Sequence, residues 1–458
     1  MGNIGLRQIH AALALLDDGW TRDVLITVED RHIAAVTHGV PPPADAARLP
    51  GVTLPGVANV HSHAFQRAMA GLAEVRAAAA DGFWSWRGLM YRFLAQLTPD
   101  EVEAIAAWSQ VEMLEAGFTS VGEFHYLHHD RGGTPYSDRA EMAGRIVAAA
   151  AASGIGLTLL PAFYAHGGCG ARPPRPEQAR FVTDLAGFCS LMEASARHVA
   201  TLPGGVLGIA PHSLRAVSDV ELRALAATFA AGPIHIHAAE QAAEVAECVA
   251  WSGASPVAWL LDNVGINARW CLVHATHMRP QESVRLAASG AVAGLCPITE
   301  ANLGDGIFAG ARYLATGGRL GVGSDSNIRV SLAEELRTLE YGQRLRDRQR
   351  NCLAPPGGST GRALFDAARR GGAQALGAPA GAIGPGRVAD LVVLDDGNPA
   401  LVGRSGDQIL DAWIFAGGDG VVRDVFAGGK HVVADGRHRD RERLYRRFAA
   451  TLARLGRG

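Results

Sequence analysis

Two histidines, His61 and His63, stand at the end of a short apolar run and together could bind a metal ion. The run spans residues 52–60 and is typical of a buried β-strand. Residues two apart on a strand point to the same side, so both imidazoles would face one ligand. Imidazole nitrogen is a common ligand of zinc. The pair supplies half of a metal site, and other segments must supply the rest.

Three later apolar runs also end in side chains that can bind metal or transfer a proton. The first contains His235 and His237 and continues to Glu240, the second ends at His274, and the third ends at Asp325. His235 and His237 face the same way on a strand, so alternation does not decide between them. A single strand-end histidine is more often structural, and Gly-Ser-Asp after a strand is often a helix N-cap. The joint occurrence of all these strand ends is what predicts a functional site.

The elements that must position these residues alternate along the chain. Strands are predicted near 56–61, 118–124, 156–162, 205–211, 233–238, 270–275, 290–296 and 319–324, and helices at 99–116, 140–153, 218–231 and 281–289. Eight such units over roughly 300 residues predict an α/β fold with a parallel (β/α)8 barrel. In that fold the carboxyl ends of the strands form the active site. A doubly wound sheet is the alternative, although no Gly-rich dinucleotide turn follows any strand.

Both ends of the chain are rich in short alternating strands and glycine turns. Because chain termini often lie close together, we predict a small discontinuous β-sandwich domain built from residues 1–52 and 380–436. The barrel would then span 53–379. Arginines alternate with apolar residues at helical spacing over 437–458, which predicts a C-terminal helix. Residues 77–80 are predicted to form a loop tip.

The composition is that of an ordinary globular protein of more than one domain: 458 residues, 48% hydrophobic, 19% charged and a net charge of −2. No basic patch dominates before the C-terminal segment, so no nucleic acid is expected as a partner. No apolar run is long enough to span a membrane, and the N-terminus lacks a signal-peptide pattern. The six cysteines are scattered without a CxxC pair, as is typical of reduced thiols. These features predict a cytoplasmic protein without a membrane partner.

The constellation of strand ends resembles the amidohydrolase superfamily, and within it the mononuclear deaminase branch. That branch carries HxH on the first barrel strand, HxxE on the fifth, His on the sixth and Asp on the eighth. The matching residues here are His61, His63, His237, Glu240, His274 and Asp325. The resemblance covers nearly the whole chain, because the plan of a barrel with a small β domain also matches.

The resemblance implies one metal site and one set of catalytic residues. The implied metal ligands are His61, His63, His237 and Asp325. A metal there lowers the pKa of water, so that hydroxide attacks an sp² carbon that bears a nitrogen. Asp325 and His274 would take the proton of the water and stabilise the developing charge, and Glu240 would protonate the leaving nitrogen.

The lysine content indicates how many metal ions the site holds. Dinuclear members of the superfamily bridge two metals with a carbamylated lysine on the fourth barrel strand. Lys430 is the single lysine of the chain, and the fourth strand runs through His212 to Arg215 without one. We therefore expect one divalent metal per subunit: zinc, with Fe²⁺ as the competing occupant.

Longer runs resemble one family in particular, the formimidoylglutamate deiminases of bacterial histidine degradation. These runs are 54–56, 61–71, 83–87, 90–92, 123–130 and 270–277. The resemblance implies hydrolysis of N-formimino-L-glutamate to N-formyl-L-glutamate and ammonia, and a homodimer. The implied substrate contacts are Gln66, Arg87, Tyr126, His212 and Arg215. Arg87 would lie in an aromatic loop after the first strand, and a guanidinium can bind a substrate carboxylate through two hydrogen bonds.

Three alternatives to this interpretation stay open. The protein could be a related deaminase acting on a purine, pyrimidine or triazine ring. It could be a metal-binding scaffold without catalysis, although Glu240, His274 and Asp325 are more than binding requires. A cousin enzyme would cleave the same substrate at another bond and release formamide and glutamate.

Overall fold

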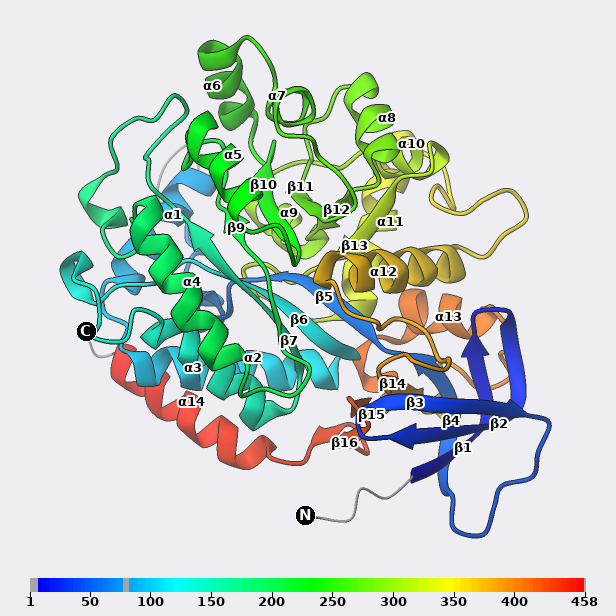
Figure 1. The fold of residues 1–458 in the computed structure, drawn as a ribbon. Helices are drawn as coiled ribbons and strands as arrows, with labels where there is room; N and C mark the ends of the chain where they lie inside the picture. Colours follow the sequence, from blue (N-terminus) through cyan, green and yellow to red (C-terminus); the bar gives the residue numbers. More distant parts are fainter. Residues whose placement is uncertain (1–6, 77–81, 457–458) are drawn as a thin grey trace.

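The computed structural model describes residues 7–76 and 82–456, and Figure 1 shows that the barrel strands lie at the centre with helices around them. The predicted loop tip at 77–80 lies outside the described residues. The strands of the central part are β5 (Val57–Ser62), β6 (Phe118–His125), β7 (Gly156–Phe163), β8 (Val206–Leu207), β9 (Ala210–Pro211), β10 (Ile234–Ala238), β11 (Trp270–His274), β12 (Val292–Leu295) and β13 (Arg319–Val322). Each predicted strand is present, and the fourth is divided into β8 and β9. The predicted α/β class is confirmed.

The central strands form two parallel sheets that face the same cluster of side chains. One sheet has the order β5-β6-β7-β8, with β9 beside β7, and the other has the order β10-β11-β12-β13. Isolated parallel bridges join Ser62 to Asp325 and Ile209 to Ile234, where the two sheets meet. The arrangement is of the TIM-barrel type. All residues of β5, β6 and β10 are buried, as expected for strands covered on both faces.

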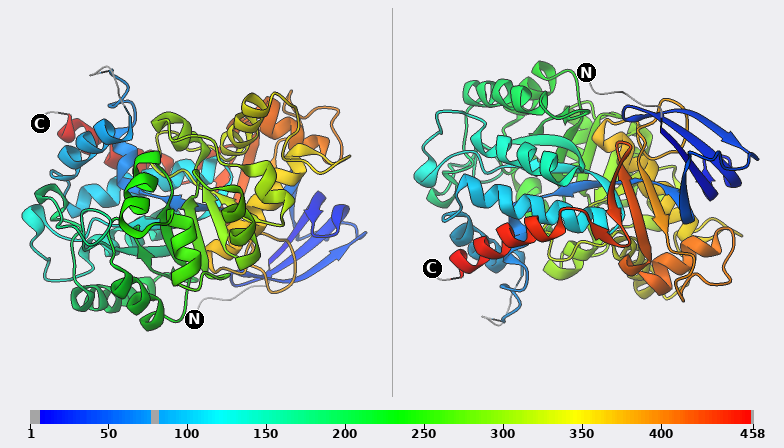
Figure 2. Two further views of the ribbon diagram at one scale, coloured as in Figure 1. Left: turned by 90° about the horizontal axis from the view of Figure 1, so that it is seen from above. Right: turned by 90° about the horizontal axis from the view of Figure 1, so that it is seen from below.

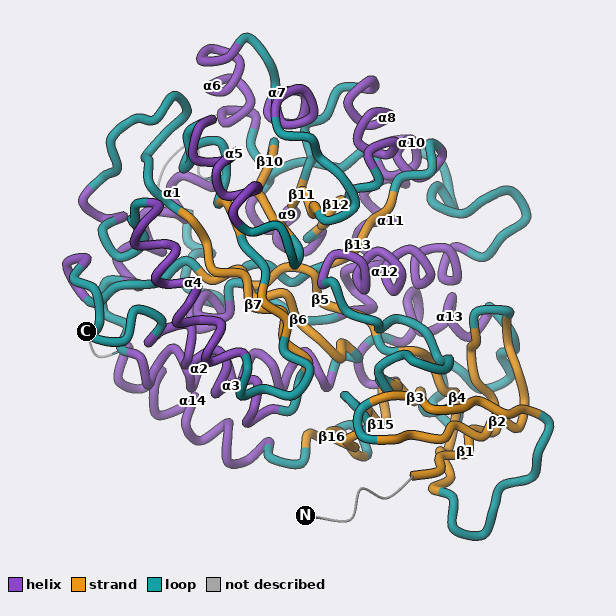
Figure 3. The backbone as a smooth tube through the Cα atoms, viewed as in Figure 1, coloured by secondary structure: helices purple, strands orange, loops and turns teal. Residues whose placement is uncertain are grey.

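Helices alternate with these strands and cover their outer side, as the tube in Figure 3 shows. They are α1 (Phe83–Leu94), α2 (Pro99–Glu115), α3 (Glu141–Ser153), α4 (Leu185–Val199), α5 (Asp219–Thr228), α6 (Ala242–Ser252), α7 (Pro256–Asn263), α8 (Pro280–Ser289), α9 (Pro297–Leu303), α10 (Gly310–Ala315), α11 (Leu332–Asp347), α12 (Thr360–Leu376), α13 (Gln408–Ala412) and α14 (Arg441–Leu455). The four helices predicted for the barrel correspond to α2, α3, α5 and α8, and α14 lies in the segment predicted as a C-terminal helix. Local signals mark them: at the start of α2, the backbone N–H of Thr98 donates to Glu101 Oε2 at 2.9 Å.

The aromatic segment after the first strand differs from its prediction. Residues 83–86, expected in a loop, begin helix α1. Met90 and Leu94 lie four residues apart, and both are buried on the inner side of this helix. Burial of this apolar face stabilises a helix where the aromatic content of the first turn had favoured a loop. Arg87 therefore projects from a regular element.

Strands from both ends of the chain form one continuous sheet, which corrects the prediction of a β-sandwich. The strands are β1 (Arg7–Leu16), β2 (Gly19–Glu29), β3 (His32–His38), β4 (Ala47–Pro55), β14 (Leu391–Leu394), β15 (Val422–Ala427), β16 (Lys430–Ala434) and β17 (Arg437–His438). Their order is β17-β16-β15-β14-β4-β1-β2-β3. The two halves are continuous because β4 pairs in parallel with β1 on one edge and antiparallel with β14 on the other. Figure 2 shows this sheet at one end of the molecule. The boundaries at residues 52, 379 and 436 stay predictions.

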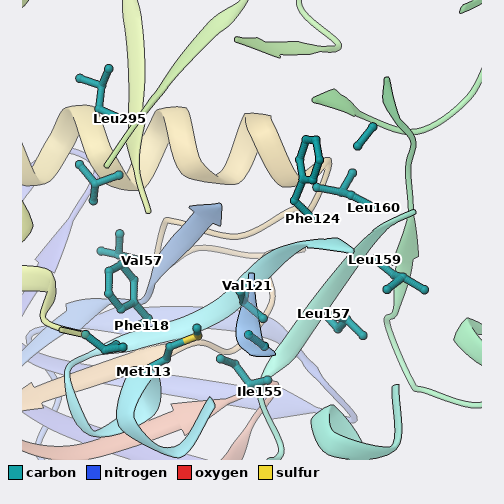
Figure 4. Packing of buried hydrophobic residues seen from close by; sticks show 14 of the residues in the cluster. Val57, Met113, Phe118, Val121, Phe124, Ile155, Leu157, Leu159, Leu160 and Leu295 are labelled. Carbon is teal, nitrogen blue, oxygen red and sulfur yellow. The ribbon is translucent and has the colours of Figure 1, made fainter. Parts of the chain in front are cut away.

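The largest buried cluster extends through the barrel and its helices to the terminal sheet, and one part of it lies between the first barrel strands and α2. Figure 4 shows Val57, Phe118 and Val121 packed beside Met113 of α2. The C-terminal helix α14 adds to this layer from outside, because the Trp108 ring stacks on Phe448 with their centroids 5.8 Å apart. Within the described residues, no helix is both long and apolar enough to cross a membrane.

Candidate active site

Four buried side chains converge at the carboxyl ends of the strands. They are His61 of β5, His63 directly after β5, His237 of β10, and Asp325 just after β13. One potential ligand atom from each lies within 4.8 Å of the others. His61 Nε2 is 3.1 Å from His237 Nε2 and 3.3 Å from Asp325 Oδ1. The structure thus brings together the four predicted metal ligands and chooses His237 over His235, whose Nε2 bonds to the carbonyl of Ala375 at 2.8 Å.

The hydrogen bonds of these imidazoles fit a bound metal ion. His63 Nδ1 lies 2.8 Å from the carbonyl of Phe124, and His237 Nδ1 lies 3.0 Å from the carbonyl of His212. A carbonyl only accepts, so each Nδ1 carries the proton and each Nε2 offers a lone pair to the cluster. Imidazole nitrogens at about 2.05 Å from a tetrahedral metal would lie about 3.3 Å apart. The observed separations match that geometry, and three nitrogens with one carboxylate suit a divalent metal.

Backbone hydrogen bonds hold the first and last strand ends together. The N–H of His63 donates to the carbonyl of Asp325, and the N–H of Asp325 donates to the carbonyl of His61, both at 2.9 Å. Asn59 Oδ1 accepts from the N–H of Ser324 at 3.1 Å. Asp325 has a φ of +44°, a left-handed conformation that costs about 1–3 kcal/mol in a non-glycine residue. These bonds stabilise the strained residue and aim its carboxylate at the histidines.

A second group of titratable residues adjoins the cluster. His274 Nε2 lies 3.8 Å from Glu240 Oε1 and 3.9 Å from Asp325 Oδ2, and its Nδ1 lies 3.2 Å from Glu300 Oε1. Burial lowers the pKa of His274, but the carboxylates of Glu240 and Glu300 outweigh this and raise it to about 10. Burial raises the pKa of Glu240 to about 7. The pair can therefore hold protons near neutral pH, as acid–base chemistry requires.

Cys296 also approaches this group, but its chemistry does not suit a metal. It forms a compact set with His274 and Asp325, whose candidate ligand atoms lie within 4.8 Å of one another. Burial raises the pKa of the Cys296 thiol well above its usual value, so the thiolate that a metal needs is disfavoured. A protonated His274 would not bind a metal either. The histidine-rich set is therefore the better metal site.

The five predicted substrate contacts line one cavity together with metal ligands and catalytic candidates. Gln66, Arg87, Tyr126, His212 and Arg215 share that cavity with His63, His237, Glu240, His274 and Asp325. The Gln66 amide donates from Nε2 to Tyr126 Oη at 2.8 Å, while its Oε1 is buried without a partner among the described residues. That oxygen is free to accept a hydrogen bond from a ligand.

The two arginines of the cavity differ in their surroundings. Arg215 is buried, with its Nη2 3.8 Å from Glu240 Oε2 and its Nε 4.0 Å from Glu244 Oε1. Arg87 has no carboxylate within 4 Å among the residues that the structure describes. Its Nε instead donates to Tyr91 Oη at 2.6 Å. Both guanidinium groups reach the cavity, one paired with acids and the other with phenols.

Several residues of the site were not predicted from the sequence. These are Tyr91, Tyr164, Gln178, Glu244 and Glu300. Tyr91 lies only four residues from Arg87, but the contacts of Tyr164 and Gln178 in the site are with residues remote in the chain. Glu300 was the one that the sequence could most easily have indicated, because it stands four residues after Cys296 at the end of a strand. Its carboxylate accepts from the backbone N–H of Cys296 at 2.9 Å. The histidines at 125, 128 and 129, which were not expected to bind metal, are not part of either cluster.

Two family models match the chain. One, described as the amidohydrolase family, matches residues 52–432, and the other, described as the formimidoylglutamate deiminase N-terminal domain, matches residues 6–48. The formimidoylglutamate deiminase of Pseudomonas aeruginosa is 51% identical over 455 residues, which covers 98% of this chain and 100% of that protein. The 8-oxoguanine deaminase of the same organism is 27% identical and covers 90% of each chain.

Solved structures of other proteins are similar to this chain over nearly its whole length. An amidohydrolase from Brucella melitensis superimposes with a TM-score of 0.94 at 50% identity and covers 98% of this chain and 99% of its own. An adenosine deaminase from Xanthomonas campestris, solved with bound zinc, has a TM-score of 0.79 at 22% identity and covers 98% of each chain. The second likeness concerns the fold alone.

Proposed function

The chain belongs to the amidohydrolase family, and from that premise we propose that it converts N-formimino-L-glutamate and water to N-formyl-L-glutamate and ammonia in histidine degradation. It is a hydrolase of C–N bonds in linear amidines. One observation of the structure carries the assignment of chemistry: a single cavity joins the His/His/His/Asp cluster to two arginines. The cluster suits hydrolysis, and the arginines suit a substrate with two carboxylates.

The metal that we propose is zinc, with Fe²⁺ as the competing occupant, held by His61, His63, His237 and Asp325. A divalent ion bound there would supply Lewis acidity, which lowers the pKa of water and polarises the formimino carbon. Nitrogen ligands and a carboxylate in a site with an open side suit zinc.

The chain's own residues would manage the protons. We propose that Asp325 accepts the proton of the attacking water, and that the protonated His274, 3.9 Å from it on one wall of the cavity, stabilises the developing negative charge. Glu240 would donate a proton to the terminal nitrogen of the formimino group as the bond from carbon to that nitrogen breaks and ammonia leaves. The oxygen of water stays on the carbon, so the organic product is N-formyl-L-glutamate. Glu300 holds His274 in position through its Nδ1.

The remaining contacts would orient the substrate. We propose that Arg87 and Arg215 each bind one carboxylate, and that Gln66, Tyr126 and His212 add directional hydrogen bonds. Burial lowers the pKa of His212 well below its usual value, so its imidazole is neutral and does not add charge to the pocket. A cytoplasmic location and a homodimer remain proposals, as does the absence of nucleic-acid and membrane partners.

The direct test identifies the products. Zinc-loaded protein incubated with N-formimino-L-glutamate at millimolar concentration is expected to release ammonia and form N-formyl-L-glutamate, which mass spectrometry identifies. Formation of glutamate and formamide would instead indicate cleavage at the other C–N bond. No ammonia release from metal-loaded protein would contradict the proposed function.

Neutral replacement of the arginines tests the class of substrate. In Arg215→Met and Arg87→Met, loss of a charged hydrogen-bond partner should lower kcat/KM for N-formimino-L-glutamate by about 10²- to 10³-fold, mainly through KM. Arg223→Met is the matched control, because Arg223 is exposed on α5 and pairs with Asp219 outside the cavity. A deaminase of a neutral ring would keep most of its activity in the cavity variants, and that result would favour the alternative.

A further inference from the structure

Two tyrosines that were not among the predicted substrate contacts form part of the cavity wall around Arg87. Tyr91 lies on α1, one turn after Arg87, and Tyr164 follows β7 directly. Arg87 donates from Nε to Tyr91 Oη at 2.6 Å and from Nη2 to Tyr164 Oη at 3.3 Å. The guanidinium also lies over the ring of Tyr91, 5.2 Å from its centroid. The two phenols thus hold Arg87 from two sides.

A buried amide fixes both phenol oxygens from behind. Gln178, in the short 3-10 helix Pro176–Gln178, has no exposed surface. Its Nε2 donates to Tyr164 Oη at 2.5 Å and to Tyr91 Oη at 3.2 Å. Its Oε1 accepts from the backbone N–H of Arg175 at 2.7 Å, so the amide can present only its NH₂ group to the tyrosines.

The hydroxyl protons of Tyr91 and Tyr164 are not used by the described residues that surround them. A phenol oxygen has two lone pairs and one proton. Each of the two oxygens already accepts from Arg87 and from Gln178, so neither hydroxyl proton can be directed at these donors. With both lone pairs of each oxygen occupied, neither phenol can also accept the proton of the other. In the described part of the chain no other acceptor bonds to either oxygen, so at least one proton is available to a ligand.

The charge around Arg87 indicates what kind of ligand accepts that proton. Burial raises the pKa of Tyr164 to about 12, so its hydroxyl stays protonated at neutral pH and remains a donor. Arg87 has no acidic partner within 4 Å among the described residues, unlike Arg215, which faces Glu240 and Glu244. A guanidinium without a counter-ion beside hydroxyl donors, in the wall of a cavity, suits a carboxylate. The subsite around Arg215 is already partly neutralised by its own carboxylates.

We propose that Tyr91 and Tyr164 donate hydrogen bonds to the same substrate carboxylate that Arg87 binds, and that Gln178 is the positioning residue for both phenols. The proposal rests on the proposed function, because it takes a dicarboxylate as the substrate. The part of the cavity around Arg87 is then a subsite of one guanidinium and two phenols. Such a subsite selects a carboxylate by the directions of its hydrogen bonds as well as by its charge.

The test removes the hydroxyls and keeps the rings. Tyr91→Phe, Tyr164→Phe and the double variant are assayed with N-formimino-L-glutamate and with two analogues, N-formiminoglycine and 4-(formimino)aminobutyrate, which each lack one carboxylate. The double variant is expected to lose about 10- to 100-fold in kcat/KM on the full substrate, mainly through KM. On the analogue that lacks the carboxylate bound by Arg87 the loss should be less than about threefold. Tyr313→Phe is the control, because its buried hydroxyl bonds to the carbonyl of Arg319 far from the cavity.

Two results would overturn the proposal. The first is wild-type kinetics in the double variant, and the second is an equal loss on the full substrate and on both analogues, which would indicate a purely structural role. Gln178→Leu should reproduce the loss on the full substrate with the same pattern across the analogues.

Binding of glutarate, measured by calorimetry, separates this proposal from the proposed function. If the wild type does not turn over N-formimino-L-glutamate, the proposed function fails. The subsite then stands if the wild type binds glutarate and the double variant binds it at least about tenfold more weakly. It is overturned if glutarate binds equally to both proteins or to neither.

Discussion

Replacement of Glu240 by glutamine is expected to lower kcat for N-formimino-L-glutamate by about 10³-fold while the metal content of the purified protein stays near that of the wild type. Glutamine has nearly the same shape but no acidic proton to give to the leaving nitrogen. Glu240 is 4% exposed and is not one of the four clustered ligands, so the metal site should form without it. Steady-state kinetics and elemental analysis of the same preparation measure the two quantities.

The pH dependence of kcat also tests whether Glu240 is the acid. Burial raises the pKa of Glu240 to about 7, against the opposing charges of His274 and Arg215. The acid form is the proton donor, so wild-type kcat should fall as the pH rises through about 7. The residual rate of Glu240→Gln should lack that fall.

The control for this variant is a glutamate of α6, the helix that follows Glu240. Glu247→Gln, on α6, removes a carboxylate that accepts from the backbone N–H of Cys169 outside the cavity, and should keep wild-type kcat. Substantial turnover by Glu240→Gln, or a wild-type rate that still increases towards pH 9, would show that another group is the acid.

Replacement of His237 by alanine is expected to remove both the metal and the activity. His237 Nε2 is 3.1 Å from His61 Nε2 at the centre of the cluster, and its Nδ1 is oriented by a backbone carbonyl. Loss of orienting groups alone weakens metal binding by about 10- to 100-fold, so loss of a ligand should weaken it by at least about 100-fold. Because water is a poor nucleophile at neutral pH without a metal, kcat/KM should fall by about 10³-fold or more.

The neighbouring histidine is the matched control. His235 lies on the same strand, two residues earlier, but bonds to the carbonyl of Ala375. His235→Gln can keep a donor for that carbonyl and should retain the metal, even where its melting temperature falls. Elemental analysis and zinc titration after removal of metal by a chelator measure both variants. Normal metal content in His237→Ala would contradict the ligand assignment.

The order of elements in the barrel could be predicted because it depends on local patterns. A buried parallel strand is apolar at every position and a helix repeats its apolar residues every three to four, so each leaves its period in the chain. The eight predicted strands and four predicted helices agree with the structure within a few residues. The strand-end motifs implied membership of the amidohydrolase family, and the longer runs implied the deimination reaction. Both are confirmed by the family models and the 51% identical relative.

Predictions that depended on how separate segments meet were less complete. The β-sandwich was wrong because β4 pairs on both edges and joins the terminal strands into one sheet. The aromatic segment before Arg87 was assigned to a loop, because the burial that stabilises α1 involves neighbours outside the segment. Pairing of this kind leaves no period in the sequence.

The sequence by itself determined which side chains stand at the strand ends and that no barrel lysine is available to bridge two metals. Covalent order and strand period suffice for this, because both are properties of a short stretch of chain. Only the tertiary structure decided that His237 rather than His235 joins the cluster, since both project from the same side of β10 and differ only in depth. It also decided that Tyr91, Tyr164 and Gln178 surround Arg87. These residues come from three separate segments, and only the packing of the whole chain brings their oxygens and nitrogens within hydrogen-bond distance.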